Sequence, residues 1–298
     1  MSAPQAVRDP EFDRPVFIIS PPRSGSTLLF ETLAQAREAC TIGNESHALI
    51  EGVEGLHPGH RQFDSNQLDA AAATPAVAAE LRRRFLAAVR DRDGRAPPHG
   101  PVRLLEKTPK NALRIPFLAK IFPEARFVYL YRDPRQTLSS MIEAWQSGRF
   151  RTYPGLPGWV GMPWSLLLVP GWRGLAGRPL HEIVAAQWKA TTCSLLDGLE
   201  ALPAGRCQAL RYDALLADPQ AQVARLCAGV GLSWDRNLDE GLRLSRFTVS
   251  MPSADKWRRH AGLIEPLLPE LQETRERAER FADAHGARSD HPASMFTA

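Results

Sequence analysis

The sequence has 298 residues, of which 44% are hydrophobic and 23% charged, and its formal net charge at pH 7 is +4. This composition is that of an ordinary globular protein and permits one large α/β domain or two small ones. The small basic excess is too weak to indicate a nucleic-acid partner, but it suits an anionic substrate or cofactor.

From the sequence we expect neither a membrane span nor a signal peptide. No apolar run approaches the ~20 residues that cross a bilayer, and residues 1–14 lack the apolar stretch of a signal peptide. The four cysteines form no CxxC pair and have no metal-ligand spacing, so we expect them to be reduced and mostly buried. These features favour a cytoplasmic protein without a membrane partner.

The first predicted element is a buried parallel strand at residues 15–20 (PVFIIS), an almost wholly apolar run rich in β-branched residues. A turn at residues 21–25 follows, and residues 27–37 have the composition of a helix. A strand, a tight loop and a helix in this order are typical of the opening of a nucleotide-binding α/β unit.

The next segments are predicted to lie at the surface. Residues 54–69 and 93–101 are rich in Gly and Pro and indicate loops, with a helix between them at residues 69–92. Residues 82–84 of this helix are three arginines, which we interpret as a solvated face rather than a binding patch.

Strands and helices alternate through the rest of the chain. The predicted strands are residues 102–105, 126–131 and 206–212, and the predicted helices are residues 110–121, 135–146 and 221–229. This alternation predicts a single α/β domain over residues 1–298, with a central parallel sheet flanked by helices in a P-loop-like arrangement. Residues 1–14 form a polar lead-in and residues 285–298 a polar tail.

One segment breaks the alternation. Residues 150–180 are irregular and apolar, and they contain Trp159, Trp164 and Trp172 among many Gly and Pro residues. A long segment of this kind in a compact domain is commonly a lid or pocket wall, here one that would cover an acceptor site. An additional packing layer explains the pattern equally well.

The loop after the first strand carries the first chemical signal. Residues 20–27 read SPPRSGST, a Gly-containing loop that leads into a helix N-terminus. Backbone N–H groups and the helix dipole can bind a phosphate there, and Arg23 adds charge. Ser20 and Ser26 stand where a Walker A loop has its first Gly and its Lys, and no strand ends in a carboxylate that could hold Mg²⁺. Hydrolysis of ATP or GTP is therefore poorly supported.

The third strand carries the second signal. It ends in Arg132, at the sheet edge where ligands of α/β folds bind, and the next helix brings Ser140 round two turns later. A guanidinium fork and a hydroxyl could together hold a terminal phosphate. Taken alone, an Arg-Asp pair after a strand, such as Arg132–Asp133, is more often a structural salt bridge.

Together the two signals resemble the PAPS-dependent sulfotransferases, in which the first loop binds the 5′-phosphosulfate of 3′-phosphoadenosine 5′-phosphosulfate (PAPS) and the second element binds the 3′-phosphate. The resemblance covers residues 15–257. It implies that the 5′-phosphosulfate is bound by Arg23, Ser24, Gly25, Ser26 and Thr27. It implies that Arg132 and Ser140 bind the 3′-phosphate.

The same family supplies two further expectations. Residues 210–213 (LRYD) look like the segment in which a tyrosine follows a later strand, which makes Tyr212 a candidate adenosine contact. A basic residue near the C-terminus usually closes over the 3′-phosphate, and Lys256 is the best match.

The catalytic groups are predicted from residues 43–47 (GNESH) and 105–109 (LEKTP). The cytosolic phenol and steroid sulfotransferases carry a Lys and a catalytic His in the latter region; here Lys107 is present but no His follows it. The chain looks closer to the Golgi-type tyrosylprotein branch and its bacterial relatives, whose base is a Glu after the first helix. Glu45 falls at that place, and its rivals are His47, Glu51 and Glu54.

Sulfuryl transfer requires in-line geometry and neutralisation of the charge on the moving group. We expect the Glu45 carboxylate to take the acceptor proton, and Lys107 and Arg23 to neutralise charge near the bridging and sulfuryl oxygens. Two cations can replace Mg²⁺, so no metal is expected. His57 and His60 lie in a Gly/Pro-rich loop without a third ligand and are interpreted as solvent-exposed.

The sequence predicts a small-molecule hydroxyl acceptor. The Trp-rich insert suits an apolar or aromatic alcohol. Two other functions remain open: a Mg-dependent nucleotide phosphotransferase that uses the same loop, and a non-catalytic nucleotide-binding protein. The sequence does not reveal the oligomeric state.

Overall fold

The structure is a computed structural model that describes residues 9–97, 100–238, 242 and 255–286. Most of the predicted polar tail at residues 285–298 lies outside the described residues. Of the lead-in, residues 9–14 are described and lie against the domain, where Phe12 is buried and pairs with Val102 in a parallel bridge.

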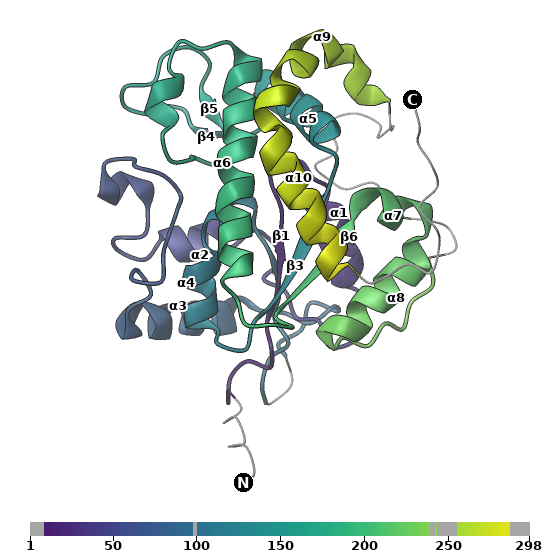
Figure 1. Ribbon diagram of the computed structural model, residues 1–298. Helices are drawn as coiled ribbons and strands as arrows, with labels where there is room; N and C mark the ends of the chain where they lie inside the picture. The colour runs from purple at the N-terminus through teal and green to yellow at the C-terminus, as the bar shows by residue number, and fades with distance from the viewer. Residues whose placement is uncertain (1–8, 98–99, 239–241, 243–254, 287–298) are drawn as a thin grey trace.

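A four-stranded parallel sheet forms the centre of the molecule (Figure 1). Its order is β2–β1–β3–β6, with β1 spanning Val16–Ile19, β2 Leu105–Lys107, β3 Arg126–Tyr131 and β6 Cys207–Arg211. β1 pairs with both β2 and β3, so that Val16 lies opposite Leu105 on one side and Arg126 on the other. β3 then pairs with β6, with Tyr131 opposite Arg211.

Helices cover both faces of this sheet, in agreement with the α/β prediction. Their bounds are α1 Ser26–Leu33, α2 His47–Glu51, α3 Pro75–Ala88, α4 Ile115–Ile121, α5 Pro134–Gln146, α6 Leu180–Glu200, α7 Tyr212–Ala217, α8 Pro219–Val230, α9 Ala261–Ile264 and α10 Leu268–His285. Short 3₁₀ helices are η1 Pro58–Arg61, η2 Pro109–Leu113, η3 Trp172–Leu175, η4 Lys256–His260 and η5 Glu265–Leu267.

Strand alternation explains the two layers. Successive side chains of a strand point to opposite faces, so Phe17 and Ile19 join the core under α4, α6 and α10, whereas Val16 and Ile18 join the core under α1, α7 and α8. In Figure 1, α6 and α10 run in front of β1 and β3. Because both faces are covered, the two central strands β1 and β3 are almost wholly apolar, as predicted, whereas the edge strand β2 carries buried Glu106 and Lys107.

Several predicted bounds were wrong. The helix predicted at residues 69–92 is shorter, because the Thr74 side chain caps its start and Pro75 occupies its first turn. The strand predicted at residues 102–105 lies further along, at Leu105–Lys107. The helix predicted at residues 110–121 is broken at Arg114, since Pro116 is tolerated only in the first turn of α4.

The arginine run at residues 82–84 is only partly solvated, contrary to our interpretation. Arg83 is exposed, but Arg82 forms ion pairs with Asp9 and Glu11 at 2.6 and 2.7 Å and lies over the Phe12 ring. These pairs fasten the lead-in to α3. The prediction failed because the acidic partners lie about seventy residues earlier in the chain.

The Trp-rich insert contains strands β4 (Arg151–Tyr153) and β5 (Trp164–Ser165), which pair antiparallel. Trp164 and Trp172 of the insert and Trp145 of α5 are almost fully buried. They belong to a third core cluster, to which α5 and α6 contribute. The insert is therefore a packing layer over much of its length. Trp159 is half-buried and leads to exposed Val160 and Met162, so a lid over an acceptor site stays a prediction.

The four cysteines are free, as expected; Cys40 and Cys227 are buried and the other two are half-buried. Among the described residues, none of the helices combines the length and apolar character that crossing a bilayer requires.

Candidate functional site

The parallel sheet gathers the predicted site residues at one edge. β1 ends at Ile19, immediately before the loop that carries Arg23, and β2 ends in Lys107. β3 is followed by Arg132, and β6 by Tyr212. Because the carboxyl ends of parallel strands meet at the same edge, residues that are far apart in sequence converge there.

The loop between β1 and α1 has the backbone of a phosphate-binding loop. Arg23 has φ 70° and Gly25 has φ 95°, both in the left-handed region. No side chain of the described residues caps the first turn of α1. The N–H groups of that turn therefore remain available to a ligand. Ser24 and Ser26 are buried beside the loop.

Tyr212 joins the two predicted phosphate elements. A Cβ atom at Gly25 would lie 2.4 Å from Cε2 of Tyr212, so only glycine lets the loop approach this ring. The Arg132 guanidinium lies over the same ring, 4.5 Å from the centroid of Tyr212. Tyr212 thus packs against both elements; whether it also contacts adenosine is a prediction.

Arg23 and Arg132 lie close together and are largely shielded from solvent. Arg132 donates from Nη1 to the Arg23 carbonyl oxygen at 3.0 Å, and Arg23 donates from Nε to Ser140 Oγ at 3.4 Å. Burial and the nearby charge of Arg132 lower the pKa of Arg23 to about 10. Burial also lowers the pKa of Arg132.

This arrangement fits a polyanionic ligand. Two half-buried guanidinium groups repel each other, and a phosphate or phosphosulfate between them would relieve the repulsion and raise their lowered pKa values. The aromatic face of Phe150, 4.6 Å from the Arg23 guanidinium, further shields the pair. Sequence reasoning missed Phe150, because nothing in its local pattern distinguishes it from the rest of the insert.

Lys256 lies in η4 against α5. Its Nζ pairs with Glu143 Oε2 at 2.8 Å, and Arg259 pairs with the other oxygen of Glu143 at 3.0 Å. Glu143 lies one helical turn after Ser140 on α5. In the same contact, Ser139 Oγ lies 2.9 Å from His260 Nδ1. The structure therefore places Lys256 beside the helix that carries Ser140, and its predicted role over the 3′-phosphate remains untested.

The predicted base and cation meet directly. Glu45 Oε1 lies 2.5 Å from Lys107 Nζ, and Glu45 Oε2 lies 3.5 Å from His47 Nδ1. Burial alone would raise the pKa of Glu45, but the hydrogen bond from His47 and the charge of Lys107 outweigh it and lower that pKa to about 2. The Glu45 side chain keeps 24% exposure, whereas the Lys107 side chain keeps only 3%.

Of the rival carboxylates, Glu51 has a different environment. Its oxygens accept hydrogen bonds from Lys110 at 2.8 Å, from Arg114 at 2.6 Å and from Asn66 at 3.1 Å. Glu54 is exposed on the surface. His47 contacts Glu45 and is therefore part of the same group rather than a separate candidate.

Sequence reasoning also missed a buried polar cluster beside Glu45. Its members are Ser46, Glu106, Thr108 and Asn111, each at most 1% exposed. A charged residue inside the apolar run at residues 104–106 was the available signal, because a carboxylate in a buried strand must find donors.

No group of three or more His, Cys, Asp or Glu side chains suited to a metal ion occurs within the described ranges. His60 is exposed, as expected, but His57 is half-buried. Each accepts a hydrogen bond at Nδ1 from a loop N–H group, of Gly55 for His60 and of Gly59 for His57. These two histidines therefore stabilise the turns around η1.

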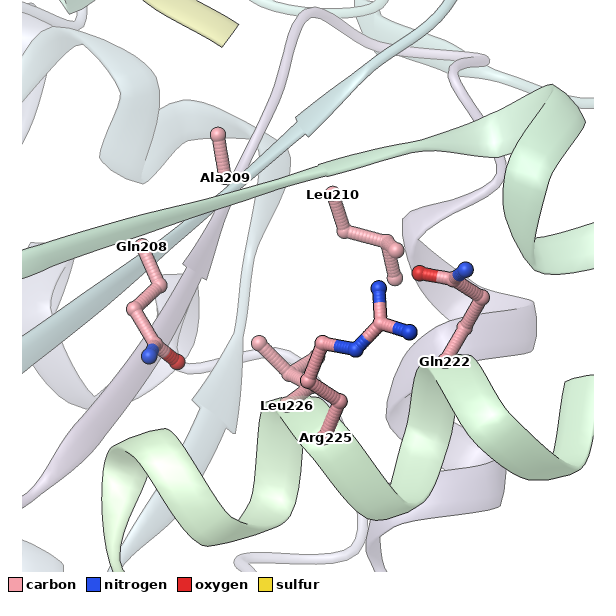
Figure 2. Close-up of a pocket in the computed structure, with 6 residues that line it drawn as sticks. All are labelled: Gln208, Ala209, Leu210, Gln222, Arg225 and Leu226. Atoms are coloured by element: carbon pink, nitrogen blue, oxygen red, sulfur yellow. The ribbon is translucent and has the colours of Figure 1, made fainter. Parts of the chain in front are cut away.

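A small pocket lies elsewhere, between β6 and α8 (Figure 2). It is lined by Gln208, Ala209, Leu210, Gln222, Arg225 and Leu226, none of which belongs to the predicted site.

Comparison with known proteins gives one family match. A family model described as "Sulfotransferase family" matches residues 15–159 and 168–236, which together make up more than two thirds of the chain. The matched residues include the loop after β1, Glu45, Lys107 and the β3–α5 element.

Two curated relatives and one solved structure show the range of similarity. The chain is 22% identical over 246 residues to protein-tyrosine sulfotransferase A of Caenorhabditis elegans, covering 81% of this chain and 56% of that protein. It is 26% identical over 126 residues to the omega-hydroxy-beta-dihydromenaquinone-9 sulfotransferase Stf3 of Mycobacterium bovis, covering 42% of this chain and 28% of that protein. The chain thus spans about half the length, or less, of these relatives. A crystal structure of a sulfotransferase from Alicyclobacillus acidocaldarius has the same fold, with a TM-score of 0.50, 12% identity and coverage of 91% of this chain and 96% of that one.

Proposed function

The chain belongs to the sulfotransferase family, and on that premise we propose that it transfers a sulfuryl group from PAPS to a hydroxyl of a small-molecule acceptor, in the cytoplasm. The observation that carries the proposal is the meeting of two kinds of group at one sheet edge. Arg23 and Arg132 form a half-buried cationic pair suited to a polyanion, and Glu45 with Lys107 forms an ion pair suited to proton transfer.

PAPS would be bound by the two elements that Tyr212 joins. The N–H groups of the α1 first turn, with Arg23 and the hydroxyls of Ser24, Ser26 and Thr27, would hold the 5′-phosphosulfate. The 3′-phosphate would lie on Arg132 and Ser140, with Lys256 over it. Arg132 supports this assignment because its guanidinium is already oriented by Tyr212 and by Gln136, whose Oε1 accepts from Nε at 3.1 Å.

The transfer forms a bond between the acceptor oxygen and sulfur and breaks the bond from sulfur to the bridging oxygen of the 5′-phosphate. Adenosine 3′,5′-bisphosphate leaves with that oxygen, and Glu45 takes the proton of the acceptor hydroxyl. Lys107 and Arg23 neutralise the charge that develops on the moving group and on the leaving oxygen. These two cations perform the role that Mg²⁺ has in kinases, and we propose that no metal takes part.

The low pKa of Glu45 is a property of its pairing with Lys107 and His47. A carboxylate with a pKa of about 2 is ionised at neutral pH but is a weak base. When the sulfuryl group of PAPS attracts Lys107, the ion pair loosens and the pKa of Glu45 rises, so the carboxylate becomes a better proton acceptor as the donor binds.

The acceptor is proposed to be an apolar or aromatic alcohol. The names of the relatives describe one enzyme that acts on a protein tyrosine and another that acts on the terminal hydroxyl of a menaquinone derivative. Half-buried Trp159, which packs against Trp145 of α5, and exposed Val160 and Met162 provide the accessible apolar surface of the insert. A phenol or a long-chain alcohol is therefore the first choice for a screen.

Calorimetric titration with adenosine 3′,5′-bisphosphate tests the proposal, with ADP and Mg-ADP as controls, on wild type and Arg132→Ala. We expect the bisphosphate to bind most tightly and Arg132→Ala to lose most of that affinity. Preference for Mg-ADP would favour the phosphotransferase instead. Tight bisphosphate binding without turnover of PAPS by 2-naphthol, 1-decanol or a tyrosine peptide would favour the non-catalytic protein.

A further inference from the structure

The buried cluster beside Glu45 has a definite hydrogen-bond order. Glu106 Oε1 accepts from the Thr108 hydroxyl at 2.5 Å, and its Oε2 accepts from Asn111 Nδ2 at 2.7 Å. Thr108 Oγ1 in turn accepts from the backbone N–H of Ser46 at 2.6 Å. Burial raises the pKa of Glu106 even though Thr108, Ser46 and Asn111 donate hydrogen bonds to it. When Glu106 is ionised, Thr108 donates its one hydroxyl proton to the carboxylate and accepts from the Ser46 N–H.

The last bond in this series fixes the peptide that joins Glu45 to Ser46. Ser46 is the residue before α2, and its peptide N–H also lies 3.4 Å from Glu106 Oε1. On the other side of this peptide, Glu45 reaches Lys107, which stands between Glu106 and Thr108 in the chain. The backbone of Glu45 is therefore held by Glu106 and Thr108, and its side chain by Lys107, which lies between them in the chain.

The composition of this cluster is costly for a purely structural role. Glu106 is fully buried and follows the apolar residues Leu104 and Leu105. A buried carboxylate costs more free energy of folding than a well-packed apolar side chain in the same place. The Glu106 oxygens meet donors from Thr108, Asn111 and Ser46, and these contacts fix the direction of the three bonds when the carboxyl group is ionised. A fixed direction is of use where a neighbouring group must be held in one geometry.

We propose that Thr108 and Glu106 are positioning residues, which hold the Glu45–Ser46 peptide so that the Glu45 carboxylate stays against Lys107. The inference rests on the proposed function, in which Glu45 is the base. Neither residue touches the reacting atoms in this account. Their effect is on the distance and orientation between the base and its cation.

The matched variants are Thr108→Val, which removes the hydroxyl at nearly constant shape, and Thr108→Ser, which keeps it. Two readouts are measured: the ¹³C resonance of the Glu45 carboxyl, assigned with Glu45→Gln, during a pH titration, and kcat for PAPS with the most active alcohol of the screen. In wild type and Thr108→Ser, we expect the Glu45 resonance not to titrate above roughly pH 4. In Thr108→Val, it should titrate within that range, because the pair with Lys107 loosens.

The rate should follow the same division. Thr108→Val should lower kcat by about 10- to 10²-fold with little change in KM for PAPS, and Thr108→Ser should restore it. Retained calorimetric binding of adenosine 3′,5′-bisphosphate shows that each variant is folded. Should Thr108→Val not fold, Glu106→Gln serves in its place. The amide of Gln has only one accepting oxygen, so its NH₂ group must face the donor of either Thr108 or Asn111.

Two results would overturn the inference: a Glu45 resonance that behaves as in wild type in the Thr108→Val protein, or a loss of melting temperature with unchanged kcat. The titration needs no turnover, so it gives its answer even when none of the alcohols reacts. Failure of the proposed function is separate from this, because it is seen in the wild-type protein as absence of bisphosphate binding.

Discussion

Glu45 and Glu51 lie at the two ends of the same short segment, and each is paired with a lysine: Glu45 with the last residue of β2 and Glu51 with a residue of η2. Glu45 meets Lys107 and His47, and its side chain keeps 24% exposure. Glu51 meets Lys110, and also Arg114 and Asn66, and keeps 10%. Both carboxylates have a lowered pKa, because nearby positive charge outweighs burial in each case.

The difference between the two lies in what is left for a substrate. The oxygens of Glu51 face the cations of Lys110 and fully buried Arg114 and the side-chain amide of Asn66. Asn66 also donates to Tyr153 and accepts from the Leu168 N–H, so this group links α2 to the Trp-rich insert. Glu45 has an open side and a cation that an anionic donor can draw away. A lowered pKa alone therefore does not identify a base, because structural ion pairs lower the pKa of a carboxylate as well.

Glu45→Gln should give the largest effect on activity. The amide is close in size but cannot take the acceptor proton, so kcat should fall by about 10²- to 10⁴-fold. Affinity for adenosine 3′,5′-bisphosphate should change little, because Glu45 lies outside the proposed nucleotide contacts. Steady-state PAPS turnover and calorimetry check the two statements, and a variant with near-normal kcat would remove Glu45 from the mechanism.

Glu51→Gln should act on stability instead. It leaves Lys110 and buried Arg114 without their counter-charge, and removing one partner of a buried ion pair costs about 3–5 kcal/mol in the free energy of unfolding. Urea denaturation measures this loss. A Glu51→Gln protein as stable as wild type would mean that the group does not link α2 to the insert in the way described.

Lys107→Ala should change both the rate and its pH dependence. Loss of the cation near the sulfuryl group should lower kcat by about 10²-fold. Glu45 acts in its ionised form, so activity disappears as the pH falls through its pKa. Lys107 lowers that pKa, so its removal raises the pKa and moves the acid limb of the kcat profile to higher pH. Lys110→Ala is the matched control, and its acid limb should move much less, because Lys110 interacts chiefly with Glu51 and only weakly with Glu45.

His47→Gln should give the smallest effect. His47 is 46% exposed and its Nδ1 lies 3.5 Å from Glu45, so solvent weakens the contact. We expect a change in kcat of less than about fivefold and a slight upward shift of the acid limb, since His47 also lowers the pKa of Glu45. A loss as large as that of Glu45→Gln would make His47 a second proton carrier.

The sequence predicted the parts of this molecule that depend on local patterns. Apolar runs such as residues 126–131 gave the strands, and strand ends followed by Arg23, Lys107, Arg132 and Tyr212 gave the sheet edge with its charged residues. The sequence assigned both Glu45 and Lys107 to catalysis, but no pattern in it predicted that their side chains are in direct contact.

The rest depends on contacts between distant segments. Asp9 and Glu11 neutralise Arg82. Asn66 and Tyr153 complete the Glu51 group. The sequence spacing of these residues indicates neither set of contacts. The break at Arg114 was missed because the apolar pattern continues through it, while the restriction that Pro116 imposes is a backbone effect. The contacts of Glu51 that favour a structural role for it were therefore visible only in the structure.

The central claim is that Glu45 is the base and Glu51 a structural partner. The most direct test is the single-turnover rate of sulfuryl transfer from bound PAPS in Glu45→Gln and Glu51→Gln, at a temperature where both variants are folded. The account predicts a rate about 10²-fold or more below wild type for Glu45→Gln and within a few-fold of wild type for Glu51→Gln. Equal losses in the two folded variants, or a greater loss in Glu51→Gln, would contradict it.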